Sequence, residues 1–430
     1  MIWTNLPVPQ RPNILLLISH DLGTHIGPYG FESTATPVLN QLAADGLTFE
    51  RHFVTSPGCS QSRSSLVTGR YPHSNGQFGL SHLGWTLNRD EELLPAVLRT
   101  NGYQTAMFGI WHLHEWTLGG FDHISDDVAV VDSSPEGFAE VASDRASTWL
   151  RHQADDQKPF YLHVGFWEAH RPFCGQPGDP AQLEEPDLSS IKVPGYLPDN
   201  EATRREFFHL QNSVKAIDAG VDRILQALAE SGKAENTLVI FTADHGLPFP
   251  RAKGTLYDPG VQVACIARLP GFIPTGGRTD VLTSNVDVMP TLLDLAAVPK
   301  SERLQGESFA SMLNGPGSGA RDAVFCEKTY HEHYDPIRCV RTATHKFIRN
   351  FAERPALVMP SDIYNSPARQ SMTTDEDFWD HRPATEFYDL HQDPSERTNL
   401  GSSAELSDRL RAWMKETADP LLDGPIPRPS

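Results

Sequence analysis

Cysteine, long apolar runs and sequence repeats are scarce or absent in this 430-residue chain. The five cysteines are widely spread and odd in number, and they form neither a disulfide framework nor a C-x-x-C metal motif. The longest apolar stretch near the start, residues 14–18, is too short to span a bilayer and lacks the features of a signal peptide. No repeat appears at the periods of solenoid proteins. We therefore expect a soluble, cytoplasmic protein with no membrane partner.

Positive charge is also in deficit. The chain has 36 Lys and Arg against 55 Asp and Glu, which gives a formal net charge of −19, and it contains no Lys/Arg-rich run. An acidic surface repels phosphate backbones, so nucleic acid is not an expected partner, although a local cationic pocket can still bind an anion. Hydrophobic residues make up 39% of the chain, which is enough for a packed core and excludes wholesale disorder.

Apolar runs and helical periodicity alternate along the chain. Residues 13–19 form a continuous apolar run, as expected of a parallel strand that is buried on both faces. Three later segments, 103–109, 160–166 and 237–244, share this character. The clearest helix lies over 207–228, where apolar residues recur at alternating spacings of three and four. This order predicts an α/β fold in which helices sandwich a mostly parallel sheet.

The chain is longer than the about 250–300 residues that one hydrophobic core usually supports, so we expect a second unit. An irregular stretch, 351–385, precedes a short terminal unit that contains one amphipathic helix. We place the boundary near residue 320. The expected division is a catalytic domain over residues 1–320 and a C-terminal subdomain over residues 321–430.

Each of the four predicted strands leads into residues that can carry chemistry. A single His or Asp at a strand end is usually a cap or a satisfied polar group, but four such ends exceed what packing requires. In open α/β sheets the ligand site lies beyond the carboxyl ends of the strands. The residues concerned are His20, Asp21, His112, His170, Asp244 and His245. On ligand type, the two His/Asp pairs suit a shared mononuclear metal site.

A second signal lies in residues 56–70. Pro57 and Gly58 end an extended segment, and a short helix rich in small hydroxyl residues begins at Cys59. The helix dipole and Arg63, one turn further on, favour the thiolate of Cys59. The free backbone N–H groups of such a helix start also suit an anion. The alternative is a small buried cysteine beside a turn.

The segment from Cys59 to Arg70 resembles the signature of the type I sulfatases, C-x-P-S-R followed by L-x-T-G-R. Further matches to that family occur in the same order from about residue 13 to residue 420. They comprise His20-Asp21, Trp111-His112-Leu113, His170-Arg171-Pro172 and the segments 241–246, 253–260 and 388–400. The resemblance implies the alkaline-phosphatase-like α/β fold. It also implies a C-terminal α+β subdomain with a short antiparallel sheet that completes the substrate pocket.

The resemblance implies a role for each matched residue. In the family a formylglycine-generating enzyme oxidises the cysteine to formylglycine, whose hydrate is the nucleophile, so Cys59 would take this role. Arg63 would hold the nucleophile, and Lys253 would neutralise the sulfate oxygens. His170 would protonate the leaving amine or oxygen, and His112 would assist the release of sulfate. Catalysis of this kind is mostly electrostatic positioning, because the metal polarises both sulfate and nucleophile.

Three residues depart from the family pattern. Gln61 replaces the proline of C-x-P-S-R, which the modifying enzyme reads, and Ile110 replaces a lysine of the sulfate pocket. His20 replaces the first aspartate of the metal site. The implied ligands are then His20, Asp21, Cys59, Asp244 and His245. Calcium, the family's metal, prefers all-oxygen shells, whereas imidazole suits manganese or zinc better. We therefore expect one divalent metal ion, calcium by resemblance, in a site shifted towards manganese or zinc.

Within the family, three stretches are similar to the sulfamidase (heparan N-sulfatase) branch, namely residues 73–80, 329–334 and 413–420. The second stretch holds the candidate sugar-binding residues His331, Glu332 and His333. The branch implies hydrolysis of a sulfate ester or sulfamate on a small sulfated sugar, such as a glycosaminoglycan unit. A homo-oligomer is compatible with the sequence.

Two alternatives stay open. The mixed His/Asp ligands are also consistent with a phosphate- or phosphonate-ester hydrolase of the same superfamily. The three departures would otherwise mark a site that binds sulfated glycans without turnover, although the retained His112, His170, Arg63 and Lys253 argue against that interpretation. Turnover of an aryl sulfate and of an aryl phosphate diester separates the two hydrolases.

Overall fold

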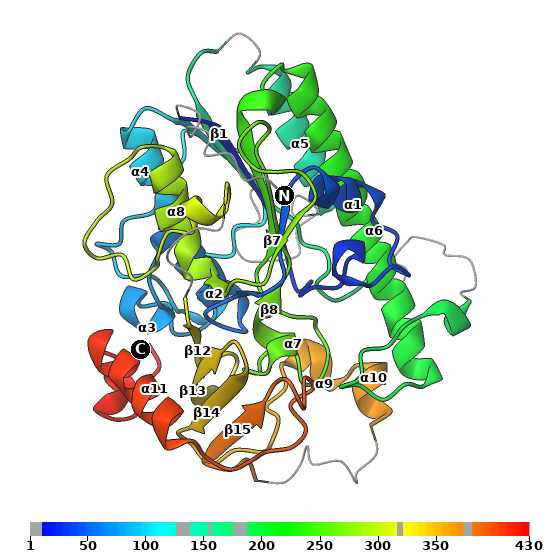
Figure 1. Ribbon diagram of the computed structural model, residues 1–430, viewed down its shortest axis with the longest axis vertical. Coiled ribbons are helices and arrows are strands. Elements are labelled where there is room, and N and C mark those ends of the chain that lie inside the picture. The colour runs from blue at the N-terminus through cyan, green and yellow to red at the C-terminus, as the bar shows by residue number, and fades with distance from the viewer. Residues whose placement is uncertain are drawn as a thin grey trace.

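The computed structural model describes residues 11–125, 138–153, 156–174, 187–315, 321–372 and 381–429 (Figure 1). Its centre is an eight-stranded, mostly parallel sheet. In sheet order the strands are β10 (Gly277–Thr279), β2 (Leu47–Phe49), β9 (Cys265–Arg268), β7 (Thr237–Ala243), β1 (Asn13–Ser19), β6 (Phe160–Gly165), β4 (Gln104–Gly109) and β5 (His123–Ile124). Strand β1 pairs in parallel with β6 and β7, whereas β9 is antiparallel to β7 and β2. The predicted α/β sheet is confirmed, and all four predicted strands belong to it.

Strand β1 is buried on both faces, and its alternate side chains enter two different cores. Leu15 and Leu17 pack in the core that is covered by α1 (Pro37–Ala44), α5 (Ala139–Arg151) and α6 (Glu201–Glu230). Leu16 and its even-numbered neighbours pack in the core that is covered by α2 (Cys59–Thr68), α4 (Leu94–Thr100) and α8 (Val288–Leu295). Figure 1 shows α5 and α6 together on one side of the sheet and α4 with α8 on the other.

Helix α6 contains the segment 207–228 that the apolar periodicity predicts as a helix. The helix begins six residues earlier because the side chain of Asn200 accepts a hydrogen bond from the backbone N–H of Thr203. It ends before Gly232, whose φ of 71° lies in the left-handed region that favours glycine.

The remaining elements are short. A three-stranded sheet comprises β11 (Thr283–Ser284), β3 (His52–Phe53) and β8 (Gln262–Val263), and two short helices are α3 (Pro72–Asn75) and α7 (Asp258–Val261). Single 3-10 turns are η1 (Gly27–Tyr29), η2 (Ser81–Leu83), η3 (Glu115–Gly120), η5 (Leu188–Ser190), η6 (Ala234–Asn236), η7 (Asn285–Asp287), η8 (Ala310–Met312) and η9 (Pro420–Leu422). Within the described ranges, none of the helices combines the length and the apolar character that crossing a membrane requires.

The C-terminal part contains a four-stranded antiparallel sheet, at the bottom of Figure 1. Its strands are β12 (Ala323–Tyr330), β13 (Tyr334–Thr342), β14 (His345–Asn350) and β15 (Thr385–Asp389), and the helices around it are α9 (Ser361–Tyr364), α10 (Pro367–Gln370) and α11 (Ala404–Glu416). The sheet joins the first part of the chain through backbone hydrogen bonds, from Glu327 to Thr55 and from Tyr330 to Phe78. The predicted antiparallel sheet is thus present, whereas the boundary placed near residue 320 falls outside the described residues.

Candidate active site

Two neighbouring strands bring the two His/Asp pairs together. Strands β1 and β7 run in register, with Ser19 opposite Ala243, so the residues that follow them leave the sheet side by side. The backbone N–H of Asp21 donates to Asp244 Oδ1 over 2.9 Å. Asp21 has a φ of 51°, a conformation that non-glycine residues adopt at a small energetic cost. The chain turns sharply here and directs the Asp21 carboxylate into the site.

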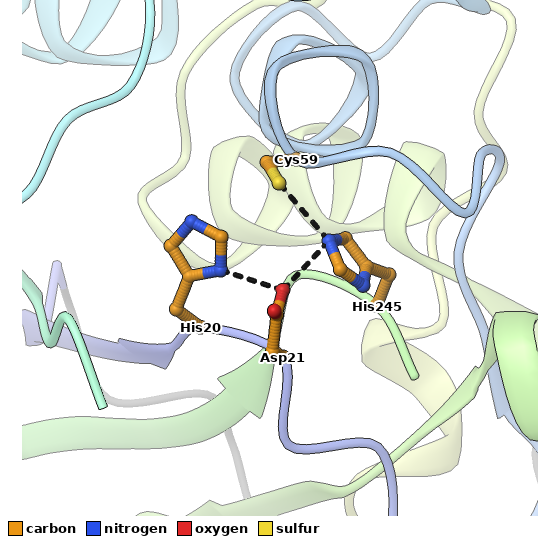
Figure 2. A group of neighbouring side chains, drawn as sticks. All are labelled: His20, Asp21, Cys59 and His245. Carbon is orange, nitrogen blue, oxygen red and sulfur yellow. Dashed lines mark hydrogen bonds and ion pairs between the residues drawn. The ribbon is translucent and has the colours of Figure 1, made fainter. Parts of the chain in front are cut away.

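Four side chains form a compact, buried cluster beyond these strands (Figure 2). His20 Nδ1 lies 2.7 Å from Asp21 Oδ1, and His245 Nε2 lies 3.0 Å from the same oxygen. Cys59 Sγ, at the first position of α2, lies 3.1 Å from His245 Nε2. One ligand atom from each of the four residues falls within 4.8 Å of the others. Two imidazoles, a carboxylate and a thiol converging in this way can hold a metal ion.

Asp244, the fifth predicted ligand, lies at the edge of this cluster. Its Oδ2 accepts a hydrogen bond from Arg63 Nε over 3.0 Å and lies 3.4 Å from His20 Nδ1. Burial opposes its ionisation, but His20, His245 and Arg63 hold the pKa of Asp244 well below its usual range. The carboxylate is therefore charged, and it neutralises Arg63 beside the cluster.

Arg63 and Ile110 line the side of the cluster that faces α2. Arg63 is buried, and its Nη1 donates to the backbone oxygen of Ile110 over 3.2 Å. Its Nη2 has no hydrogen-bond partner within the part of the chain that the structure describes. The Ile110 side chain is fully buried against Trp167. The position of the family lysine is thus apolar here, and Arg63 keeps a donor available for an anion.

Lys253 and His170 lie on the side of the ligand cluster that is opposite Arg63. Lys253 Nζ lies 2.8 Å from Asp21 Oδ2, and the pKa of the buried lysine is raised because Asp21 and Asp362 outweigh the effect of burial. In turn, Lys253 lowers the pKa of Asp21 to about 2, against the effect of burial. His170 Nε2 lies 3.9 Å from Asp21 Oδ2. His112 reaches the cluster from β4, with Nδ1 3.3 Å from His20 Nε2.

Asp362 is a site residue that sequence reasoning misses. It belongs to the short helix α9, and its Oδ2 lies 2.9 Å from Lys253 Nζ and 3.9 Å from His170 Nε2. The sequence carries no signal for it, because Asp362 follows no strand, belongs to no matched motif and lies in the irregular stretch 351–385. Only the folding of this stretch over the site brings the carboxylate to Lys253.

The three candidate sugar-binding residues have different surroundings. His331 is buried in the turn between β12 and β13, and neither of its ring nitrogens has a hydrogen-bond partner within the described ranges. The pKa of His331 is lowered, mainly by burial and in addition by the charge of Lys253. The Glu332 carboxylate accepts hydrogen bonds from the backbone N–H and the hydroxyl of Ser361, over 2.9 and 2.7 Å. His333 is exposed. The structure therefore brings His331 close to Lys253 and His245, whereas His333 is exposed to solvent.

Side chains that can bind a metal ion thus lie beyond the carboxyl ends of the parallel strands. Two buried cations, Arg63 and Lys253, and the two histidines His112 and His170 surround them. This arrangement is that of a hydrolase that cleaves anionic esters with the help of a metal ion. The chain belongs to the sulfatase family, because the family model described as Sulfatase matches residues 12–298. A second model, described as N-sulphoglucosamine sulphohydrolase, C-terminal, matches residues 245–377.

Individual relatives agree with the family assignment. An ulvan-active sulfatase of Formosa agariphila is 28% identical over 459 residues, which cover 96% of this chain and 75% of the relative. The N-sulphoglucosamine sulphohydrolase of Homo sapiens is 29% identical, with 96% of this chain and 92% of the relative covered. A protein solved in complex with its substrate D-glucosamine-2-N,6-O-disulfate shares the fold, with a TM-score of 0.72, 21% identity, and coverage of 95% of this chain and 99% of that chain.

The sulfatase resemblance that the sequence carries is confirmed by these matches, as is the similarity to the sulfamidase branch. The chain is a hydrolase of sulfate esters or sulfamates, and its family generally uses a metal ion and formylglycine.

Proposed function

We propose that this chain removes sulfate from a small sulfated sugar, using Cys59 as formylglycine and one divalent metal ion. The observation that carries the proposal is the position of Cys59. Its Sγ lies at the start of α2, within 4.8 Å of the ligand atoms of His20, Asp21 and His245. An atom at this position is placed to act both as nucleophile and as metal ligand.

We infer that a formylglycine-generating enzyme converts Cys59 despite Gln61. Formylglycine supplies a hydrated aldehyde, with one hydroxyl to attack sulfur and a second to expel sulfate. Burial raises the pKa of the Cys59 thiol well above its ordinary value and outweighs the lowering effects of Lys253 and Arg63, against the thiolate that the helix start and Arg63 were expected to favour. The buried Gln61 side chain is accommodated in the folded protein, where its Nε2 donates to the backbone oxygen of Tyr330 over 2.6 Å.

The donor set favours a transition metal over calcium. Calcium takes six to eight oxygen ligands, whereas the cluster offers the imidazoles of His20 and His245 with one facing carboxylate, that of Asp21. Asp244 is engaged by Arg63. We therefore propose that zinc or manganese is held by His20, Asp21, His245 and the side chain at position 59. When bound there, such an ion would supply Lewis-acid chemistry at the sulfate group.

The cations in the site fit a sulfate group by charge. Arg63 has a free Nη2 donor within the described structure, and Lys253 lies on the other side of the cluster with its charge secured by two carboxylates. Fixed donors of this kind stabilise the charge that develops on the sulfate oxygens, and they need no rearrangement during the reaction.

His170 and His112 are placed to move protons. The Nδ1 of His170 is hydrogen-bonded to the backbone oxygen of Arg171, which leaves Nε2 directed at the cluster. Burial, and next Lys253, lowers its pKa, so the neutral ring keeps its proton on Nδ1, and Nε2 must first gain the proton that it would pass to the leaving oxygen or nitrogen. His112 Nδ1 lies 3.3 Å from His20 Nε2, next to the ligand cluster.

The test is release of sulfate from 4-nitrophenyl sulfate and glucosamine 2-N-sulfate, measured beside hydrolysis of bis(4-nitrophenyl) phosphate. We expect the wild type to release sulfate, and Cys59→Ala to lower kcat/KM on the order of 10³-fold or more. Cys265→Ala, in a buried strand outside the cluster, is the matched control and should keep its activity. A higher kcat/KM for the phosphate diester, or binding of the sulfated sugar without turnover, would contradict the proposal.

A further inference from the structure

Asp362 adds a second carboxylate to a site that binds an anion. Its Oδ2 and Asp21 Oδ2 both contact Lys253 Nζ, at 2.9 and 2.8 Å. His170 Nε2 lies 3.9 Å from each of these two oxygens. Lys253 therefore has two carboxylate partners, and the second of them, Asp362, also lies beside His170.

The exposure of these side chains separates the floor of the site from its mouth. Asp21 and Lys253 are 0% and 2% exposed, whereas His170 and Asp362 are 18% and 19% exposed. A sulfate group that binds Lys253 would lie on the buried side, next to the ligand cluster. The atom that leaves with the sugar would then lie on the partly exposed side, near His170 and Asp362.

Asp362 is held in this position from outside the catalytic core. Ser361, the preceding residue, donates two hydrogen bonds to the Glu332 carboxylate. Glu332 lies in the turn between β12 and β13, next to the buried His331. The two contacts fix the start of α9 to the C-terminal sheet, and they restrict the carboxylate of Asp362 to the mouth of the site.

We propose that Asp362 is a specificity-determining residue that selects sulfate bound to nitrogen over sulfate bound to oxygen. The inference rests on the proposed function. A sulfamate nitrogen carries a hydrogen that Asp362 can accept, whereas an ester oxygen carries none. A carboxylate also favours positive charge on the leaving nitrogen and disfavours negative charge on a leaving oxygen.

The reaction balances without any further reactant. Water adds across the bond between sulfur and the leaving atom, and the oxygen of water ends on sulfur. With a sulfamate, the S–N bond breaks, the electron pair stays on nitrogen, and protons from His170 and water convert it to an ammonium beside Asp362. With an ester, the S–O bond breaks and the product is a neutral alcohol, which gains nothing from the carboxylate.

The experiment compares two sugars that differ only in the group that carries the sulfate, an NH in glucosamine 2-N-sulfate and an oxygen in glucose 2-O-sulfate. Asp362→Asn keeps the shape of the side chain and removes its charge. We expect kcat/KM for the N-sulfate to fall about tenfold or more, as for loss of a hydrogen bond to a charged group, and kcat/KM for the O-sulfate to change less than about threefold. Asp362→Glu, which keeps a carboxylate, should recover part of the preference. Asp408→Asn, an exposed carboxylate on α11, is the matched control and should change neither value.

A purely structural role for Asp362 predicts a different result. If Asp362 only positions Lys253, its removal would weaken the binding of the sulfate group by Lys253. The value of kcat/KM would then fall equally for both sugars, and that outcome overturns the inference. An unchanged preference in Asp362→Asn overturns it as well. The proposed function is judged separately, because release of sulfate from 4-nitrophenyl sulfate by the wild type supports it whichever way the comparison between the sugars falls.

Discussion

His20 is the residue that most changes the chemistry of the metal cluster. The family pattern has an aspartate at this position, whereas here an imidazole nitrogen lies 2.7 Å from the Asp21 carboxylate. A nitrogen donor cannot contribute to the oxygen shell that calcium prefers, but it is a common ligand of zinc and manganese. The preference for a metal should therefore follow the side chain at position 20.

We predict that His20→Asp lowers the affinity for zinc about tenfold or more and raises the affinity for calcium. The measurement is calorimetric titration of the metal-stripped protein with each ion, which does not depend on activity. His152→Ala removes an exposed imidazole outside the cluster and serves as the control. An identical ratio of zinc to calcium affinity in the wild type and His20→Asp would exclude a role for this residue in metal choice.

His331 should contribute to sugar binding, because it is buried beside the site and its ring nitrogens have no partner within the described residues. We predict that His331→Ala raises KM about threefold or more, with a smaller change in kcat, since a lost hydrogen bond to the sugar weakens binding. Steady-state kinetics with glucosamine 2-N-sulfate measures both constants. His333→Ala, which alters an exposed neighbour, is the control. An unchanged KM in His331→Ala would rule out the contact.

The residues at the strand ends were predictable from the sequence, and the residues that cover the site were not. His20, Asp21 and His245 directly follow continuous apolar runs, and parallel strands end at a common edge. Asp362 and Glu332 reach the site through contacts between segments that are far apart in sequence. Such contacts leave no local pattern of hydrophobicity or spacing.

Among the secondary-structure elements, the hairpin of β12 and β13 carries several buried charged side chains. Lys328 Nζ lies 2.6 Å from Asp335 Oδ2, and Arg382 forms a second ion pair with the same carboxylate. Burial opposes the ionisation of Asp335, but Lys328 and Arg382 lower its pKa to about 2. Burial also lowers the pKa of Lys328, which reflects the desolvation that this pair must overcome.

The lowered pKa of Asp335 has a consequence for stability. The ionised Asp335 carboxylate contributes to the free energy of unfolding. This contribution is fully present above the pKa of about 4 that Asp335 has in the unfolded state, and it is lost as the pH falls through about 2, because the unfolded state binds the proton first. We predict that Asp335→Asn lowers the free energy of unfolding by about 3 kcal/mol at neutral pH and makes it less dependent on pH below about 4. Urea denaturation at a series of pH values, with Asp408→Asn as the control, measures this effect. Equal pH dependence in Asp335→Asn and the wild type would contradict it.

The whole molecule depends on a buried ionic network that ties the end of the chain to both parts. Arg338 is fully buried, and its Nε lies 2.6 Å from Asp419 Oδ2 and 3.5 Å from Glu327 Oε2. Glu327 also pairs with His73, which lies in α3 beside the helix of Cys59. The C-terminal residues therefore hold the sheet that presents His331 and Glu332 to the site.

We predict that Asp419→Ala destabilises the protein by about 3–5 kcal/mol, because it leaves the Arg338 guanidinium buried without its main partner. Thermal unfolding followed by circular dichroism measures the loss. Asp322→Ala, which removes the exposed partner of Arg409, is the control and should cost less than about 1 kcal/mol. Similar melting temperatures for the two variants would show that the network does not hold the molecule together.

For the whole molecule, the sequence predicted the sheet and the C-terminal unit, because short continuous apolar runs indicate the buried strands and one amphipathic helix indicates the terminal unit. The division at residue 320 stays a prediction. The contacts from Glu327 to Thr55 and from Lys328 to Gly254, over 2.7 and 2.6 Å, join the two parts next to the site. Composition alone gives no measure of such an interface.

The central claim is that Cys59 acts as formylglycine in a metal-assisted sulfatase, and the most direct test is the mass of the peptide from His52 to Arg63. The peptide should come from protein purified from its own host, where the modifying enzyme is present. We predict a peptide lighter than the cysteine form by about the mass of one water molecule. An unmodified Cys59 in protein that still releases sulfate from glucosamine 2-N-sulfate would contradict this mechanism.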